Sequence, residues 1–333
     1  MRAILMTAPG GVEVLQLRDI EPPALPSPHH LLVKLAAAGV NPVDTKLRAK
    51  PAYYPDRLPA ILGCDGAGIV TATGSAVTRF KPGDAVYFCN GGIGAEPGCY
   101  AEFTALHEDY CAAKPARLSL QDAAALPLAL ITAWEALHER THLHDGHSIL
   151  IHAGAGGVGH IAVQLAHHVG ACVAVTVSDE HKAGLARGFG AEKIISYRTQ
   201  DFVQETLDWT HGDGADVVFD TVGGDTFLRS LNAARIGGKV VSLLSTPLSL
   251  ADTQLARLRN LSLCYELMLT PQLMQQHDAR VRQRRILEAG ARLVDAGALT
   301  VLVSQRLPLE QVAQAHRLIE AGGMTGKIIL TLD

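Results

Sequence analysis

The sequence predicts an α/β protein in which a β-rich domain is followed by a doubly wound parallel-sheet domain. The chain of 333 residues is longer than a usual single domain, so two domains with separate cores are expected. Before about residue 125, short β-type runs are separated by turns rich in glycine and proline. From about 148 to 245, apolar strands alternate with helical stretches, which is the pattern of parallel βαβ units.

The N-terminal part has the pattern of a compact, antiparallel domain of barrel type. Its strand candidates are the runs at 30–40 (HLLVKLAAAGV), 66–74 (GAGIVTATG) and 84–89 (DAVYFC). Turn segments such as PALPSPHH, KPGD and NGGIGAEPG lie around and between them. Short strands joined by such turns are typical of antiparallel barrels.

The middle part alternates strand and helix candidates with short connections, which predicts a doubly wound sheet. The strand candidates are 148–153, 172–177, 216–220 and 239–244, and the helix candidates are 156–169, 180–189 and 225–232. After about residue 260 the pattern predicts a helical region at 278–296, an apolar run at 299–309, a helix at 309–322 and a last strand at 326–332. Periodicity alone does not show whether this tail rejoins the first domain.

Composition argues against several classes of function. The net charge is only -4 and 48% of the residues are hydrophobic, which indicates neither a nucleic-acid-binding surface nor a disordered acidic tail. The longest apolar run, 123–133, contains Pro127 and is far shorter than the roughly 20 residues that span a bilayer. Six cysteines without the spacing of a disulfide framework predict a reducing, cytoplasmic setting. The expected partner is therefore a small molecule, and neither nucleic acid nor a membrane.

The strongest motif is G-x-G-x-x-G at the end of an apolar strand and the start of an amphipathic helix. We expect Gly154 to permit a tight turn, Gly156 to let the backbone approach a pyrophosphate, and Gly159 to allow close packing of helix and strand. The alternative, a merely glycine-rich turn, is disfavoured by the βα units that follow. The predicted phosphate-binding residues are Gly154, Ala155, Gly156, Gly157, Val158 and Gly159.

The end of the next strand indicates which dinucleotide binds. An acidic residue there would accept the ribose hydroxyls of NAD, but Thr176 and Val177 are neutral. Ser178, Lys182 and Tyr197 instead offer a hydroxyl, a cation and a phenol, which suit a 2′-phosphate. The predicted cofactor is therefore NADPH.

Two acidic residues complicate this preference. Asp179 and Glu180 follow the strand and argue against NADPH if either side chain turns inward. The alternative is that both belong to a solvated helix N-terminus, where carboxylates are favoured.

Several linked motifs resemble the zinc-independent quinone oxidoreductases of the medium-chain dehydrogenase/reductase superfamily. They are the glycine motif together with AAAGVNPVDTKLR, PAILGCDGAGIV, PGCYAEF, LPLALITAWEAL, ADVVFDTVGG and GMTGKIILTL, and they cover essentially the whole chain. The resemblance implies a GroES-like catalytic domain at 1–124, completed by 261–333, and a Rossmann dinucleotide-binding domain at 125–260. It also implies a cofactor cleft at the junction of the domains and a homodimer.

The resemblance also bears on a metal. Zinc-using members of that superfamily have a cysteine and a histidine–glutamate pair at the positions that resemble Asn41 and Cys64–Asp65 here. Near the third expected ligand position, this chain has no sulfur or imidazole around Thr132. A catalytic zinc needs three protein ligands, so no bound metal is predicted. Cys64 is then better explained as a small buried thiol in a turn.

A structural zinc is not predicted either. Cys89, Cys99 and Cys111 lie ten and twelve residues apart and lack the C-x2-C spacing of a closed tetrahedral site.

The catalytic candidates are those that match the family pattern, each with a simpler alternative. Asn41 and Asp44 are candidates for orienting substrate or nicotinamide, or else they form an Asx turn that caps the following helix. Tyr53 and Tyr54 are candidates for donating a phenol hydrogen bond to the substrate oxygen. The alternative for one of the pair is a role in packing alone.

Two further candidates lie nearer the cofactor in the family. Thr132 matches a threonine near the nicotinamide, and its alternative role is to bond its own helix backbone. Gly326 and Lys327 match a terminal motif close to the cofactor, and the alternative is an ordinary lysine on a strand edge.

Without a metal, reduction is easier than alcohol oxidation, because a quinone or an enone is already an electrophile. The predicted function is a zinc-independent NADPH-dependent quinone oxidoreductase that transfers hydride, or single electrons, to a quinone. Two alternatives remain open. One is an NADPH-dependent reductase of α,β-unsaturated carbonyls or enoyl thioesters, and the other is a non-catalytic NADPH-binding protein.

Overall fold

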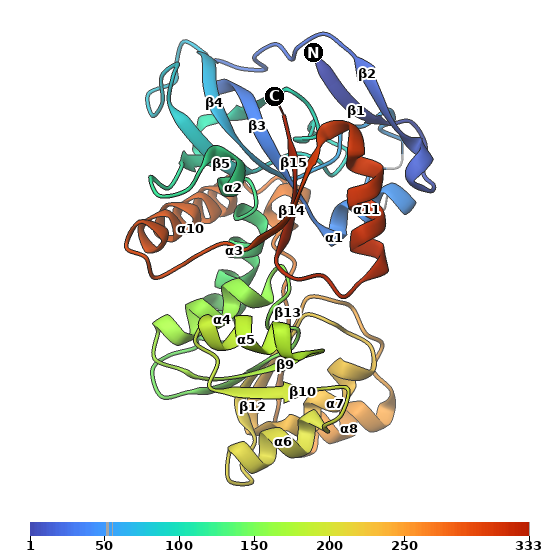
Figure 1. Ribbon diagram of the computed structural model, residues 1–333, viewed down its shortest axis with the longest axis vertical. Coiled ribbons are helices and arrows are strands. Elements are labelled where there is room, and N and C mark those ends of the chain that lie inside the picture. Colours follow the sequence, from blue (N-terminus) through green and yellow to red (C-terminus); the bar gives the residue numbers. More distant parts are fainter. Residues whose placement is uncertain (51–52, 55, 333) are drawn as a thin grey trace. The chain divides into compact units, whose positions relative to one another are not determined.

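The computed structural model describes residues 1–50, 53–54 and 56–332. The described residues form two compact units, one from Met1–Ile131 with Leu269–Asp333 and the other from Thr132–Met268. The first unit is discontinuous in sequence, because the C-terminal tail belongs with the N-terminal part. In Figure 1 the red helix α11 (Val312–Ala321) accordingly lies beside the blue helix α1 (Pro42–Ala49).

The first unit is built on a mostly antiparallel sheet with the strand order β14-β15-β3-β4-β5-β7, in which β6 also pairs with β3. The strands of this sheet are β3 (His30–Val40), β4 (Asp65–Thr73), β5 (Ala85–Cys89), β6 (Phe103–His107), β7 (Cys111–Ala113), β14 (Val303–Pro308) and β15 (Lys327–Thr331). A separate antiparallel pair joins β1 (Arg2–Met6) to β2 (Leu15–Asp19). The tail therefore completes the sheet of the N-terminal part through β15, which pairs with β3.

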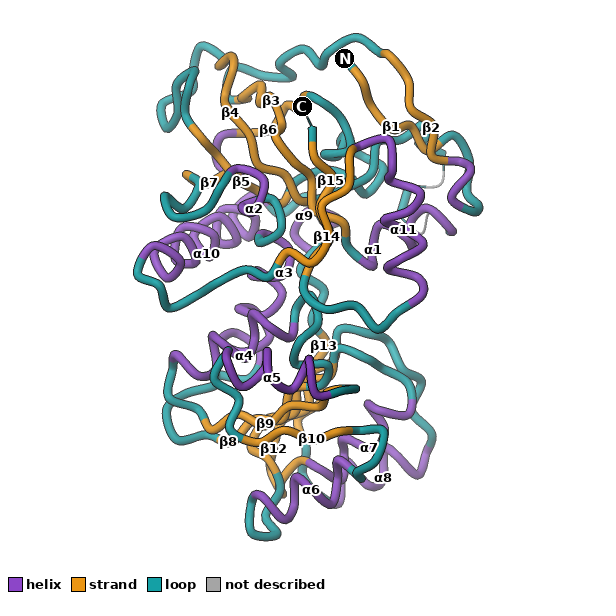
Figure 2. The backbone as a smooth tube through the Cα atoms, in the orientation of Figure 1, coloured by secondary structure: helices purple, strands orange, loops and turns teal. Residues whose placement is uncertain are grey.

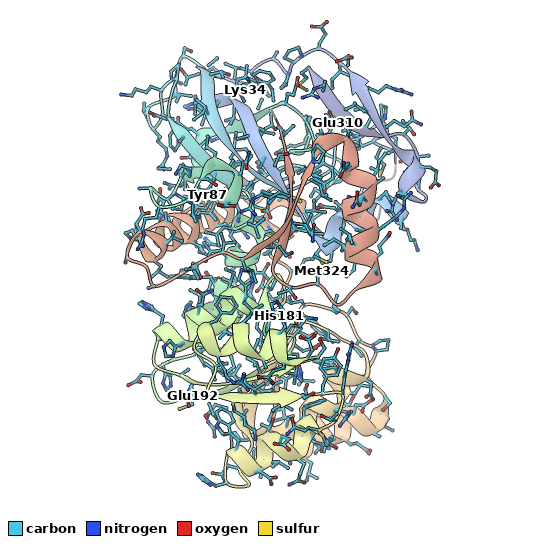
Figure 3. All side chains as sticks on the ribbon, in the orientation of Figure 1. Lys34, Tyr87, His181, Glu192, Glu310 and Met324 are labelled. Carbon is cyan, nitrogen blue, oxygen red and sulfur yellow. The ribbon has the colours of Figure 1, made fainter. Side chains whose placement is uncertain are left out.

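Strand β3 shows why these residues form a sheet. Its alternating Leu31, Val33 and Leu35 are buried, whereas Lys34 between them is exposed, as the labelled side chain in Figure 3 illustrates. Strand β4 approaches closely at Gly68, where a Cβ atom would lie 2.1 Å from the carbonyl oxygen of Lys34. The predicted range of this strand, 30–40, agrees with the observed one.

Helices cover the sheet of the first unit. They are α1, α2 (Leu120–Ala123), α3 (Pro127–Trp134), α9 (Thr270–Leu273), α10 (His277–Asp295) and α11, and α3 continues past the division between the units. Helix α10 packs on β7, and the buried phenol of Tyr87 on β5, labelled in Figure 3, donates to the carbonyl oxygen of Leu287 (2.5 Å). The helical tail is thereby attached to the sheet by both packing and a buried hydrogen bond.

The second unit is a doubly wound parallel sheet with the strand order β10-β9-β8-β11-β12-β13. Its strands are β8 (Ser148–Ile151), β9 (Cys172–Val177), β10 (Lys193–Ser196), β11 (Ala215–Asp220), β12 (Ala234–Ser242) and β13 (Ser262–Tyr265). Figure 2 shows α4 (Gly159–His168) and α5 (Glu180–Gly188) on one face of this sheet, and α6 (Phe202–Trp209), α7 (Asp225–Ala233) and α8 (Leu250–Leu258) on the other. The predicted fold class, α/β with a Rossmann-type parallel sheet, is confirmed.

Two strands of the parallel sheet, β10 and β13, were missed by the sequence pattern, and each is only four residues long. Strand β13 lies just beyond residue 260, where the pattern predicted no strand before the helical region at 278–296, and it pairs in parallel with β12. Ser262 and Tyr265 at the ends of β13 are exposed, so this strand lacks the apolar run by which β8, β9, β11 and β12 were found. Among the described residues, no helix is long and apolar enough to cross a membrane.

Candidate functional site

The glycine motif forms the connection between β8 and α4, and a side chain would clash at Gly154 and Gly159 and fit only tightly at Gly156. A Cβ atom at Gly154 would lie 2.6 Å from Cβ of Val175, and one at Gly159 would lie 2.2 Å from the carbonyl oxygen of Ala153. At Gly156 the corresponding distance to that oxygen is 3.1 Å. The glycines therefore let the turn pack closely against β9 and against its own backbone at the N-terminus of α4, which is the position at which such a motif holds a pyrophosphate.

The reason expected for Gly154 differs from the observed one. The left-handed residue of the turn is Ala153, with φ 52°, and Gly154 is instead required by its close contact with β9. Helix α4 begins at Gly159, whereas the sequence pattern predicted a start at Gly156.

Two of the predicted 2′-phosphate residues meet just beyond the end of β9. Nζ of Lys182 donates to Oγ of Ser178 (2.9 Å), so that an ammonium and a hydroxyl lie side by side. Tyr197 directly follows β10, and its backbone N–H donates to the carbonyl oxygen of Val177 (3.2 Å). Its side chain is 52% exposed. The structure thus gathers a hydroxyl, a cation and a phenol at two neighbouring strand ends.

The acidic residues in this region behave differently from each other. Asp179 caps α5 by accepting the backbone N–H of Lys182 (3.0 Å), and it also accepts the hydroxyl of Ser178 (2.7 Å). These two hydrogen bonds lower the pKa of Asp179. Glu180 is exposed and pairs with Arg187 (2.6 Å) along α5. Asp179 therefore lies within the predicted phosphate cluster, whereas Glu180 pairs along its own helix.

A second polar cluster is buried in the first unit. Nδ2 of Asn41 donates to Oδ2 of Asp65 (2.9 Å), and Nζ of Lys327 donates to Oδ1 of Asn41. Nζ of Lys327 also lies 3.5 Å from Oδ2 of Asp65. The backbone N–H of Leu128 donates to the other oxygen of Asp65 (2.7 Å). The amide of Asn41 is thus held in one orientation between an ammonium and a carboxylate.

Burial and charge act against each other at Asp65. Burial raises the pKa of its carboxyl group, and the ammonium of Lys327 opposes that rise. Lys327 itself is buried at the start of β15, which lies between β14 and β3. The alternative of an ordinary lysine on a strand edge is therefore wrong.

Asp44 adjoins this cluster and is fully buried at the start of α1. Its Oδ2 accepts the backbone N–H of Asn41 (2.8 Å) and the phenol of Tyr100 (2.8 Å). Burial raises its pKa from 3.8 to about 7, and the two hydrogen bonds oppose the rise. Its Oδ1 has no hydrogen-bond partner among the described residues. The predicted turn at Asn41–Asp44 therefore exists, and it also anchors a larger network.

The network continues from Tyr100 to the surface. Nε2 of His316 lies 3.3 Å from the phenol oxygen, and Nδ1 lies 3.4 Å from Nη1 of Arg48, which pairs with Glu320 (2.5 Å). Because Arg48 has only donors, Nδ1 of His316 must be the acceptor, and the proton of the neutral ring is on Nε2. This Nε2–H donates to the phenol oxygen of Tyr100, and the phenol in turn donates to Asp44. Burial and the guanidinium of Arg48 lower the pKa of His316 to about 4, so the imidazole stays neutral in this arrangement.

The sequence pattern did not identify Tyr100, Arg48 or His316 as site residues. Tyr100 lies within the PGCYAEF motif, and Arg48 lies in the last turn of α1, the helix that follows Asn41. His316 follows Val312 by four residues on the buried face of α11, where a histidine is unusual. A histidine at a buried helix position could have indicated a functional role, but it did not show which residues His316 contacts.

The thiol that suggested a metal site is engaged elsewhere. A hydrogen bond with the thiol of Cys89, together with burial, raises the pKa of Cys64 well above its usual range. In residues 1–50, 53–54 and 56–332, no three His, Cys, Asp or Glu side chains are arranged to hold a metal ion. The neighbouring carboxylate of Asp65 forms an ion pair with the ammonium of Lys327.

The remaining predicted residues are placed as follows. Tyr53 is exposed, and Tyr54 is half-buried, with its Cβ atom close to Gly94. Residues 51, 52 and 55 beside them lie outside the described part of the chain. Thr132 is buried on α3 and belongs to the second unit. The structure thus brings Asn41, Asp44 and Lys327 together, and it does the same for Ser178 and Lys182.

Comparisons with known proteins agree with this architecture. Residues 27–116 match the alcohol dehydrogenase GroES-like domain family, and residues 189–330 match a family described as zinc-binding dehydrogenase. A quinone oxidoreductase of Pseudomonas aeruginosa is 35% identical over 330 residues, with 99% of each chain covered. Quinone oxidoreductase 1 of Escherichia coli is 33% identical, with 96% of each chain covered.

Solved structures of similar proteins cover the whole chain. An alcohol dehydrogenase superfamily protein from Novosphingobium aromaticivorans superposes with a TM-score of 0.92 at 32% identity, covering 100% of both chains. The Escherichia coli quinone oxidoreductase complexed with NADPH superposes with a TM-score of 0.88 at 31% identity, again covering 100% of both chains.

Proposed function

Because the chain belongs to the quinone oxidoreductase family of the medium-chain dehydrogenase/reductase superfamily, we propose that it reduces quinones with NADPH and without zinc. The observation that carries this proposal is the state of Asp65, whose oxygens are occupied by Asn41, Leu128 and the ammonium of Lys327. A carboxylate satisfied in this way within the protein does not need a metal ion as its partner.

The cofactor proposal rests on two groups of residues. The glycine motif lies between β8 and the N-terminus of α4, where the backbone N–H groups of a helix N-terminus suit a dinucleotide pyrophosphate. The ammonium of Lys182 and the hydroxyl of Ser178 fit a 2′-phosphate, since charge-assisted hydrogen bonds suit a dianion. The Escherichia coli relative was solved as a complex with NADPH, which supports the same choice.

The chemistry that we propose needs little from the protein beyond position and polarity. NADPH, when bound, supplies a hydride from C4 of its nicotinamide. A quinone that gains this hydride and one proton becomes a hydroquinone, and NADP+ is left. The chain's part is to hold the quinone, to exclude water and to hydrogen-bond the oxygen on which negative charge develops.

The candidate catalytic residues divide by exposure. Asn41 and Asp44 are buried, so we propose that they act as positioning residues through their neighbours. Tyr53 and Tyr54 retain exposed surface and are proposed to give a phenol to the substrate oxygen. Thr132 is proposed to lie near the nicotinamide, as the family resemblance implies.

Two further expectations concern the state of the protein. A homodimer, implied by the family, is proposed and would be measured by light scattering after size-exclusion chromatography. A cytoplasmic location also stays a prediction. It agrees with the six cysteines, which the structure describes as free thiols.

The experiment that tests the function follows the loss of reduced-nicotinamide absorbance. NADPH and NADH are each offered with an ortho-quinone, a para-quinone and a simple enone. Turnover of a quinone with NADPH supports the proposal. Turnover of the enone alone would instead identify a reductase of activated double bonds, and NADPH binding without turnover of any acceptor would favour a binding role.

A further inference from the structure

A histidine lies buried directly beside the glycine motif, and nothing in the proposed chemistry uses it. His152 follows the last residue of β8 and precedes the left-handed Ala153. It is 1% exposed. Its Nδ1 lies 3.2 Å from Oγ1 of Thr176, and its Nε2 lies 3.0 Å from Oγ of Ser230 on α7. Buried imidazoles with both nitrogens engaged have a defined tautomer, which here follows from the partners.

The direction of each hydrogen bond is settled by Ser230. Its hydroxyl donates to the carbonyl oxygen of Thr226 (2.7 Å), so it accepts from the other side. Nε2 of His152 is therefore the protonated nitrogen, and Nδ1 of the neutral ring is an acceptor. The hydroxyl of Thr176 must then donate to Nδ1.

At its other end the chain of hydrogen bonds reaches the cofactor turn. Oγ1 of Thr176 accepts the backbone N–H of Ala153 (3.1 Å), and its carbonyl oxygen accepts the backbone N–H of Gly154 (3.1 Å). Ala153 has φ 52°, a conformation that costs a non-glycine residue free energy unless the surroundings hold it. Thr176 thus accepts the N–H groups of both Ala153 and Gly154, and His152 fixes the orientation of the hydroxyl that accepts the first of them.

The surroundings of the ring keep it neutral. It packs edge-on against Phe202 of α6, with ring centroids 4.7 Å apart, and Asp220 of β11 and Arg229 of α7 are the charged groups that act on it. Burial, the largest influence, lowers the pKa of His152 to about 4, with Asp220 acting in the opposite direction. The neutral tautomer is thus the state at physiological pH.

We infer that His152 is a positioning residue of the dinucleotide site, which as the neutral Nε2–H tautomer links α7 through Thr176 to the left-handed turn of the glycine motif. The hydrogen bonds run from Ala153 N–H to Thr176, from Thr176 to His152, from His152 to Ser230, and from Ser230 to helix α7. The inference rests on the proposed function only in that the glycine turn binds a nicotinamide dinucleotide.

The first test removes one hydroxyl from the chain while keeping the shape of the side chain. Thr176→Val leaves the N–H of Ala153 and Nδ1 of His152 without their partner, and the dissociation constant for NADPH should rise on the order of tenfold. Thr206→Val is the matched control, because Thr206 is equally buried in the same unit and donates only to the carbonyl oxygen of Phe202. Quenching of protein fluorescence by NADPH measures binding, and urea unfolding measures stability in both variants.

The second test observes the ring itself. Nitrogen-15 NMR of histidine-labelled protein at neutral pH should show His152 protonated at Nε2 and unprotonated at Nδ1, and Ser230→Ala should change that resonance pattern. A protonated Nδ1, or equal NADPH affinity in Thr176→Val and the Thr206→Val control, would overturn the inference.

These outcomes are separable from the fate of the proposed function. Wild-type protein that binds NADPH tightly but reduces no quinone contradicts the function and leaves the inference standing. Wild-type protein that binds neither NADPH nor NADH removes the dinucleotide site, and the inference fails with it.

Discussion

The ammonium of Lys327, in the last strand of the chain, donates a hydrogen bond to the amide oxygen of Asn41, which precedes the first helix of the same unit. The same Nζ lies 3.5 Å from Asp65. A buried cation, an amide and a carboxylate thereby satisfy one another where a zinc-dependent relative is expected to place metal ligands.

Replacing Lys327 with methionine should destabilise the protein. The change leaves the carboxylate of Asp65 buried without its cation, and breaking a buried pair in this way costs about 3 to 5 kcal/mol. The free energy of unfolding from urea titration measures the loss. Lys34→Met, on the exposed side of β3, is the control and should change stability little. Equal effects of the two substitutions would contradict the pairing.

Lys182 should discriminate between the two cofactors. Lys182→Ala removes the ammonium beside Ser178 and should raise the Michaelis constant for NADPH, with NADH nearly unaffected. The lost charge-assisted contact corresponds to about 1.5 to 3 kcal/mol. Arg187→Ala on the same helix should alter neither constant, because Arg187 pairs with Glu180 on the surface. Similar effects of Lys182→Ala on both cofactors would refute the phosphate assignment.

Asp179 should limit the preference for NADPH. Its carboxylate accepts the hydroxyl of Ser178 and lies 3.8 Å from Nζ of Lys182, so it competes with a 2′-phosphate for both groups. Asp179→Asn keeps a helix-capping oxygen and should lower the Michaelis constant for NADPH several-fold. Glu180→Gln is the control with the same change of charge. An unchanged ratio between NADPH and NADH would show that Asp179 does not compete.

The buried carboxyl of Asp44 should make stability depend on pH. Folding raises its pKa from 3.8 to about 7, so below about pH 4 the group is neutral in both states. As the pH rises from about 4 to about 7, the unfolded state loses the proton first, and this contribution to stability falls. Above pH 7 the loss is complete, and the full difference corresponds to about 4 kcal/mol.

Asp44→Asn tests this dependence through urea midpoints measured at pH 5 and pH 8. From pH 5 to pH 8, the wild type should lose more stability than the Asp44→Asn variant loses. Asp252→Asn is the control, because hydrogen bonds from Ser249 lower the pKa of Asp252 from 3.8, so this group titrates below both pH values and should add no pH dependence between them. If the urea midpoints of the wild type and of Asp44→Asn changed equally between the two pH values, titration of the buried Asp44 carboxyl would be excluded as the cause.

Elemental analysis of the purified protein should find zinc far below one atom per chain. Prolonged treatment with a chelator should then leave quinone reduction unchanged, because the residues that would be ligands are Asn41, Cys64 and Asp65, and Asp65 is paired with Lys327. Stoichiometric zinc that is lost together with activity would contradict the metal-free proposal.

Local pattern was sufficient for much of the fold. Strand β3 was predicted over its observed range because a half-buried strand alternates its side chains, and the parallel sheet followed from apolar runs separated by helices. The glycine motif was equally local, since its spacing and its position after a strand are visible in one stretch of sequence. Strands β10 and β13 were missed because each is only four residues long and too short to show a clear apolar run.

The composition, the motifs and their order in the chain by themselves determined the fold class, the glycine turn and the family that the chain resembles. Only the tertiary structure decided that Lys327 meets Asn41 and Asp65, that Tyr100 and His316 support Asp44, and that His152 meets Thr176 beside the glycine motif. The physical reason is sequence separation. Periodicity reports which face of an element is buried, whereas partners such as Lys327 and Asn41, which stand 286 residues apart, are chosen by the packing of whole elements.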